Sequence, residues 1–136
     1  MAIEQTGVEC WEGVVGVGRA RVAARVIVHP GVEDVSVQQV LEALADPARR
    51  TVVRTLAHSG ADLSCGSFDL PVGRSTSSHH FSVLREAGLL RQYYVGTTKM
   101  NALRSEELEQ RFPGLLTAVV AAADAEAAHT PTIRGA

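Results

Sequence analysis

The sequence predicts a mainly α-helical domain that carries one β-hairpin. Apolar residues recur at helical spacing in several segments between residues 35 and 128, and residues 89–103 show the β-prone pattern of a hairpin. The length of 136 residues suits one domain. Aromatic residues make up only 4% of the chain, so Ala, Val and Leu must fill the core, which favours closely packed helices.

The chain divides into three parts by composition. Residues 1–30 form a poorly defined N-terminal arm, because the glycine-rich run 13–18 lacks helical spacing; short strands and a partly disordered arm are both open. Pro30-Gly31 ends this part. We expect the compact domain over residues 31–129 and a disordered tail over residues 130–136.

Two helices begin the compact domain. The first is predicted over Val35–Ala45, on an apolar stripe that consists of Val37, Val40, Leu41 and Leu44. The second is predicted over Pro47–His58, because Asp46 suits an N-cap, Pro47 suits the first helical turn and Gly60 suits a left-handed C-cap.

The next two elements are predicted to form a helix-turn-helix. Residues Ala61–Leu70 are read as a short helix, Pro71 to Arg74 as a tight turn, and Ser75–Ala87 as a longer helix. We expect Ser75 to N-cap this longer helix and Gly88 to close it. Its inward anchors should be Phe81 and Leu84.

A hairpin and two further helices complete the order. The strands are predicted over Leu89–Val95 and Lys99–Leu103 around a Gly96-Thr97 turn. Ser105 should cap a short helix, and the last helix should run over Leu115–Ala128. A hairpin directly after the second helix of a helix-turn-helix is a wing, so the predicted fold is a winged helix-turn-helix.

Three segments of the chain resemble the ArsR family of winged-helix regulators. They are residues 44–50 (LADPARR), 75–81 (STSSHHF) and 83–90 (VLREAGLL), and the resemblance covers about residues 34–124. A fourth segment, residues 111–116 (RFPGLL), also resembles members of that family. The resemblance implies a homodimeric transcription factor, usually a repressor, whose dimer interface uses the first and last helices, here Val35–Ala45 and Leu115–Ala128.

The resemblance and the helix-turn-helix together point to residues that should contact double-stranded DNA. A recognition helix places its N-terminal residues in the major groove, where hydroxyl groups and imidazoles reach phosphates or base edges. The candidate DNA-binding residues are Arg74, Ser75, Thr76, Ser78, His79, Arg91 and Lys99. His79 stands where relatives often carry Arg, Ser75 also suits a simple cap, and His80 is expected to pack inward.

The charge distribution supports this surface although the net charge of the chain is −2. Between residues 74 and 104 one acid, Glu86, stands against five Lys or Arg residues. Two of these five, Arg85 and Arg104, are further candidate phosphate contacts, and Arg85 could equally pair with a neighbouring acid. A dimer should read an operator that is an inverted repeat.

The sequence contains no recognisable ligand-binding motif that would identify the signal to which such a protein responds. Cys65, Asp124 and His129 are weak candidates for metal binding, so we expect no metal site and no cofactor. Cys65 could instead be a thiol switch beside the helix-turn-helix. A metal- or thiol-responsive sensor and a winged-helix module for protein contacts remain the alternatives to a repressor with an unknown effector.

Several other classes are disfavoured. The sequence has none of the nucleophile-elbow, P-loop, zinc-protease or dinucleotide-binding motifs, so we expect no enzyme. No run of 18 apolar residues predicts a membrane span, and no signal peptide is expected. Two cysteines in 136 residues fit a cytoplasmic location.

Overall fold

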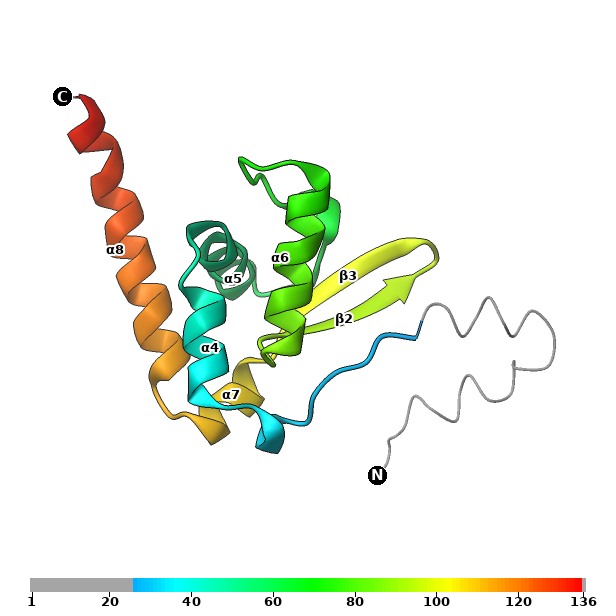
Figure 1. Cartoon of the computed structure of the whole chain (residues 1–136). Helices are drawn as coiled ribbons and strands as arrows, with labels where there is room; N and C mark the ends of the chain where they lie inside the picture. Colours follow the sequence, from blue (N-terminus) through cyan, green and yellow to red (C-terminus); the bar gives the residue numbers. More distant parts are fainter. Residues whose placement is uncertain (1–25, 136) are drawn as a thin grey trace, which may run out of the picture.

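A computed structural model describes residues 26–135 (Figure 1). The predicted winged helix-turn-helix is confirmed: five α-helices and a three-stranded antiparallel sheet occur within this range. The elements are, in order, η1 (Val32–Asp34), α4 (Val37–Leu44), α5 (Pro47–Ser59), β1 (Leu63–Ser64), η2 (Cys65–Ser67), α6 (Arg74–Glu86), β2 (Leu90–Val95), β3 (Thr98–Leu103), α7 (Ser105–Arg111) and α8 (Leu115–Gly135). Residues 1–25, most of the predicted N-terminal arm, lie outside the described residues.

The first helix is shorter than predicted. It begins at Val37 because Ser36 N-caps it in a capping box with Gln39, and Val35 lies before the cap in an extended conformation. Arg49 and Arg50, which belong to a segment that resembles the ArsR family, hold the other end of α4. Arg49 donates to the carbonyls of residues 42 and 43, and Arg50 donates to those of residues 44 and 45.

The second helix agrees with its predicted caps. The Asp46 carboxylate accepts from the backbone N–H groups of Ala48 and Arg49, and Pro47 occupies the first helical turn. Gly60 ends the helix in the left-handed conformation at φ 66°. The helix therefore ends at Ser59, one residue beyond the predicted His58.

The predicted helix over Ala61–Leu70 is wrong. Leu63 and Ser64 instead form strand β1, which pairs with Asn101 and Met100 of β3, and the 3-10 turn η2 follows it. The Asn101 side-chain amide also donates to the Leu63 carbonyl at 3.2 Å. The pairing partner lies 38 residues away in sequence, so a local apolar pattern does not reveal it.

Helix α6, which the sequence predicts as a recognition helix, begins one residue before the predicted start. Gly73 is its N-cap and makes no side-chain cap hydrogen bond, so Ser75 lies inside the first turn and does not cap the helix. The helix ends at Glu86, one residue before the predicted Ala87, and Gly88 closes it as predicted, at φ 84°. A Cβ on Gly88 would lie 2.5 Å from Cγ2 of Val35, so this position also needs glycine for space.

The wing is a regular antiparallel hairpin. Strand β3 lies in the centre of the sheet, in the order β1-β3-β2, and Leu90 to Val95 pair one-to-one with Leu103 to Thr98. Gly96 turns the chain at φ 64°. Strand β2 is thus an edge strand among the described residues.

The last two helices differ from prediction at their ends. Ser105 is the first residue of α7, the N-cap is Arg104, and Ser105 provides no cap. Helix α8 runs to Gly135, so it extends past the predicted end at Ala128 and through most of the segment 130–136, where a disordered tail was expected. None of the helices between residues 26 and 135 has the length and apolarity of a bilayer crossing.

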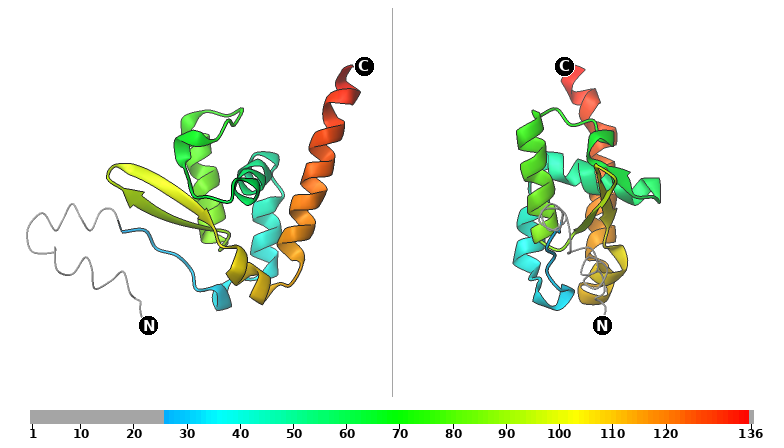
Figure 2. Two further views of the ribbon diagram at one scale, coloured as in Figure 1. Left: turned by 180° about the vertical axis from the view of Figure 1, so that it is seen from behind. Right: turned by 90° about the vertical axis from the view of Figure 1, so that its right-hand side faces the viewer.

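The wing and α8 lie on opposite sides of the molecule, with α4, α5 and α6 between them (Figure 2). The core between these elements contains Val40, Val52, Val53, Leu84 and Leu89, all of them almost fully buried. This core holds α6 against the rest of the domain and leaves one of its faces open to solvent.

Candidate nucleic-acid interface

Helix α6 has one buried face, which fixes its orientation. His80, Phe81 and Leu84 lie on this face and are at most 7% exposed. The Phe81 ring packs on Phe68 with a centroid distance of 5.3 Å. The predicted core roles of Phe81 and Leu84 are therefore confirmed.

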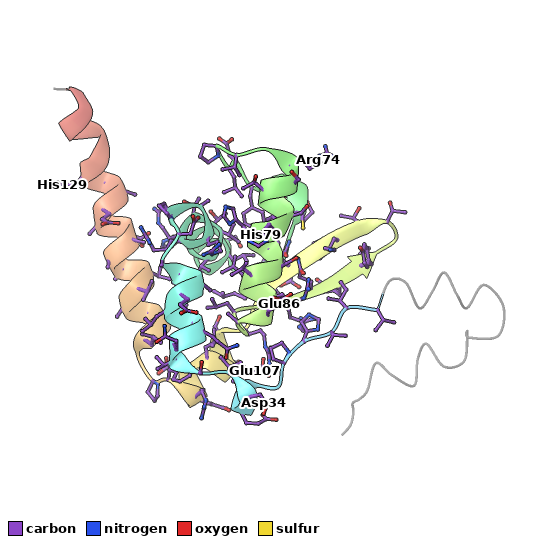
Figure 3. All side chains as sticks on the ribbon, viewed as in Figure 1. Asp34, Arg74, His79, Glu86, Glu107 and His129 are labelled. Atoms are coloured by element: carbon purple, nitrogen blue, oxygen red, sulfur yellow. The ribbon has the colours of Figure 1, made fainter. Side chains whose placement is uncertain are left out.

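The opposite face of the same helix presents the predicted DNA-contacting residues. Exposed side chains occupy its first two turns: Arg74, Ser75, Thr76, Ser78 and His79. Figure 3 labels Arg74 at the N-terminal end of α6, His79 further along and Glu86 near its C-terminal end. The structure thus brings the five candidates from this helix together on one solvent-facing surface, with the acid of α6 at the far end.

His80 packs inward, as expected, and links α6 to the start of α5. Its Nδ1 lies 3.1 Å from Nη1 of Arg49, and because a guanidinium only donates, Nδ1 is the acceptor. Its Nε2 lies 3.7 Å from the Asp46 carboxylate. Burial acts to raise the pKa of Asp46, but the hydrogen bonds from the backbone N–H groups of Arg49 and Ala48 hold that pKa below its usual value.

The two basic candidates on the wing lie on opposite faces of the hairpin. Lys99 pairs with Tyr94 in the register and its ammonium lies 5.7 Å from the Tyr94 ring centroid. Arg91 lies on the other face with Tyr93, whose ring centroid is 5.0 Å from the guanidinium carbon. Gln92, which bonds to Arg85 of α6, shares the face of Lys99. Lys99 therefore lies on the side of the wing that faces the recognition helix, and Arg91 does not.

A buried polar network joins the wing to α6, and the sequence analysis missed it. Arg85 Nη1 donates to Gln92 Oε1 at 2.8 Å, and Gln92 Nε2 donates to Asn101 Oδ1 at 2.7 Å. Asn101 Nδ2 then lies 3.2 Å from the Cys65 sulfur. Gln92 and Asn101 are almost fully buried. Amide side chains at inward positions of both wing strands were the available sequence signal.

Two candidate phosphate contacts have protein partners instead. Arg85 belongs to the buried network and also lies 3.6 Å from the Glu86 carboxylate. Arg104 pairs with Glu107 at 2.7 Å and donates to the Pro30 carbonyl at 2.9 Å. Hydrogen bonds to the Arg104 guanidinium come first among the causes that hold the pKa of Glu107 below its usual value.

Comparison with known proteins gives two relatives of the same kind. The chain is 39% identical over 80 residues to the uncharacterized HTH-type transcriptional regulator YceK of Bacillus subtilis, which covers 57% of this chain and 80% of that protein. It is 36% identical over 93 residues to the HTH-type transcriptional regulator Rv2034 of Mycobacterium tuberculosis, which covers 62% of this chain and 86% of that protein. The chain belongs to the HTH-type transcriptional regulators. No protein-family model matches it.

Membership in this family agrees with the predicted DNA-binding regulator and makes the protein a regulator and not an enzyme. In the winged helix-turn-helix of this regulator, α6 is the helix that directly precedes the hairpin, and the β2–β3 hairpin is the wing.

The three weak metal candidates do not meet in the regulator. Asp124 on α8 accepts from Arg54 Nε at 2.6 Å and lies 2.8 Å from His58 Nε2, both on α5. The hydrogen bond from Arg54 is the main cause that holds the pKa of Asp124 below its usual value. The hydrogen bond from His58 lowers this pKa further, and burial acts in the opposite direction. Among residues 26–129, no group of three or more His, Cys, Asp or Glu side chains could hold a metal ion.

Cys65 lies at the edge of the candidate interface. A hollow of about 400 Å³ opens between η2 and α6, and Cys65, Arg74, Ser78 and Phe81 are among its lining residues. The thiol is partly buried and belongs to no disulfide. A change at this sulfur would therefore occur beside the N-terminal turns of the recognition helix.

Proposed function

We propose that the regulator is a sequence-specific, ArsR-like repressor that binds an operator as a homodimer and leaves it in response to a signal. The observation that carries this proposal is the exposed polar surface over the first two turns of α6, backed by an anchored apolar face. The three segments that resemble the ArsR family support the finer assignment. Such a protein would act in the cytoplasm, where the low cysteine content also fits.

The roles within this interface follow from the side-chain chemistry. Arg74 would contact a phosphate beside the N-terminus of α6, and the hydroxyls of Ser75, Thr76 and Ser78 would donate to phosphate or base acceptors. His79 would read a base edge with one donor and one acceptor, which gives weaker guanine recognition than a bidentate Arg. Lys99 would add a phosphate contact from the wing.

The homodimer is supported by the side of the molecule opposite the wing. Val37 and Leu41 of α4 are exposed to 46% and 48%, although both are large and apolar. The start of α8 lies next to α4, where Leu115 and Leu116 line the same small hollow as Val40 (Figure 1). The exposed residues of α8 include Ala118, Ala121, Ala122 and Ala125. Small side chains allow close helix approach, so a second copy would cover this face and place two recognition helices about 34–36 Å apart on an inverted repeat.

A titration against the DNA upstream of its own gene tests the DNA-binding role. The protein, Arg74→Ala and His79→Ala are compared at two salt concentrations, with Gln110→Ala at an exposed position of α7 as the control. We expect binding that weakens steeply with salt, a loss in both test variants, and a normal control. A wild-type protein that binds no DNA in the presence or absence of zinc, nickel or oxidant would favour the protein-interaction module.

Sedimentation equilibrium tests the dimer separately. Leu41→Glu places a charge in the proposed interface, and Val28→Glu places one at a residue that is 79% exposed elsewhere. We expect a dimer for the wild type and for Val28→Glu, and a monomer for Leu41→Glu. A monomeric wild type at micromolar concentration would contradict the dimer.

A thiol-responsive sensor is the second candidate, because Cys65 lies beside Arg74 in the hollow and within 3.2 Å of the Asn101 amide. Peroxide or diamide should then weaken operator binding in the wild type and leave Cys65→Ser unaffected. Unchanged affinity after oxidation of the Cys65 thiol would exclude this mode of sensing.

A further inference from the structure

Residues 26–31 run beside the outer edge of the wing in Figure 1, before the chain reaches η1. We refer to this segment as the strap. The backbone N–H of Gln92 on edge strand β2 donates to Nε2 of His29 at 2.9 Å. An edge strand leaves backbone groups without a partner strand, and the His29 imidazole satisfies one of them.

A second contact holds the strap at Pro30, the residue after His29. Nη1 of Arg104 donates to the Pro30 carbonyl at 2.9 Å, and the same guanidinium pairs with Glu107 through Nε and Nη2. This contact involves a permanently charged donor and a backbone acceptor, so it does not depend on pH near neutrality. The His29 contact is the titratable one of the two.

The surroundings of His29 favour its neutral form. Its charged neighbours are Arg85 from α6, Arg91 from β2 and Arg104 from the N-cap of α7, with Glu107 of α7 as the nearby acid. Burial comes first in lowering the pKa of His29, and Arg104, Arg85 and Arg91 lower it further. A hydrogen bond with the Ile27 backbone acts in the opposite direction.

We propose that His29 is a pH-dependent latch that fastens the strap to the edge of the wing when neutral and releases it when protonated. A protonated Nε2 carries a hydrogen and cannot accept from the Gln92 N–H. Protonation would also place a fourth positive charge among three guanidinium groups. Both effects act against the closed strap.

The direction of the pH dependence follows from the lowered pKa. The stabilisation of the closed strap is complete above about pH 6.5, the ordinary His value, and is lost as the pH falls through the lower pKa of the closed state. Gln92 also belongs to the buried network that joins the wing to α6, so release of the strap changes the support of the wing at that residue.

Nuclear magnetic resonance of the full chain tests the latch without any DNA. The heteronuclear NOE of residues 26–31, the Gln92 amide shift and the His29 imidazole shifts are followed from about pH 8 to pH 5. His29→Gln retains an oxygen acceptor that does not titrate, His29→Ala has no acceptor, and His129→Gln is the control histidine.

In the wild type and the control, we expect the strap to lose order and the Gln92 amide to shift with one midpoint, that of His29, below pH 6.5. The strap of His29→Gln should keep the same order at both ends of the titration, and that of His29→Ala should be loose at both. The latch is overturned if the wild-type strap stays ordered after His29 has titrated, or if His29→Gln loosens at low pH as the wild type does. Unchanged resonances of Leu84 and Asn101 confirm that each variant is folded.

Discussion

Gln92 and Asn101 face each other across the wing and share a hydrogen bond of 2.7 Å in a nearly solvent-free interior. Arg85 extends this pair to the recognition helix, and Cys65 extends it to the turn before that helix. The wing is therefore attached to α6 by oriented polar contacts in addition to apolar packing. Both side-chain amides of this network, those of Gln92 and Asn101, have hydrogen-bond partners, and this allows them to be buried without a large loss of free energy.

Asn101→Leu should destabilise the fold, because it leaves the Gln92 amide and the Leu63 carbonyl without the Asn101 partner. A buried polar group that loses its partner costs about 1–3 kcal/mol, and urea unfolding measures the change in the free energy of unfolding. Asn101→Asp, which keeps the size but loses the amide donor, should be destabilised as well. A Leu variant as stable as the wild type would show that the network does not contribute to stability.

Gly88→Ala should be destabilising for two reasons, backbone strain and overpacking. Comparison with Gly60→Ala distinguishes the two contributions. Gly88 has φ 84° and its Cβ would clash with Val35, whereas Gly60 has φ 66° and open space around it. We expect a loss of about 3 kcal/mol for Gly88→Ala, from backbone strain plus overpacking, and about 1 kcal/mol for Gly60→Ala, from strain alone. Thermal unfolding of both variants measures the difference, and equal losses would contradict the role of Val35.

The parts of the fold that the sequence predicted are those determined by nearby residues. Asp46, Pro47 and Gly60 define α5 within a few positions of its ends, and the Gly96 turn defines the hairpin. Residues 61–70 were misread because β1 exists through its pairing with β3, far along the chain. The cap at Gly73 was missed because it uses no side chain.

In the candidate interface, too, the features that depend on nearby residues were predictable from the sequence and those that depend on distant residues were not. The position of Arg74 and His79 near the start of one predicted helix was enough to identify them as candidates, and both side chains are exposed. The opposite placement of Arg91 and Lys99 depends on strand register, and the partner of His29 lies 63 residues away. Contacts of this kind depend on tertiary structure, so no local sequence pattern predicts them.

Asp124→Asn should weaken the attachment of α8 to α5 at neutral pH and have no effect in acid. Arg54 and His58 keep the Asp124 carboxylate ionised, so its stabilisation is complete above its ordinary pKa of 3.8 and is lost as the pH falls through the lowered value. The melting temperature of the variant should therefore lie below that of the wild type at pH 7 and converge with it near pH 2. Asp69→Asn, at an exposed position, is the control and should show no such pattern. A gap of the same size at both pH values would contradict the ion-pair origin.

Lys99→Ala and Arg91→Ala should differ in their effect on DNA binding, because the two residues lie on opposite faces of the wing. If Lys99 contacts a phosphate beside the recognition helix, its loss should weaken binding to all sequences and reduce the salt slope of the binding constant by about 1. Arg91, whose guanidinium lies over Tyr93 and away from α6, should change that slope much less. Fluorescence anisotropy over a series of salt concentrations measures both slopes on operator and random duplexes. Equal slope changes would mean that DNA wraps both faces of the hairpin, and a larger change for Arg91 would place the DNA on the face away from α6.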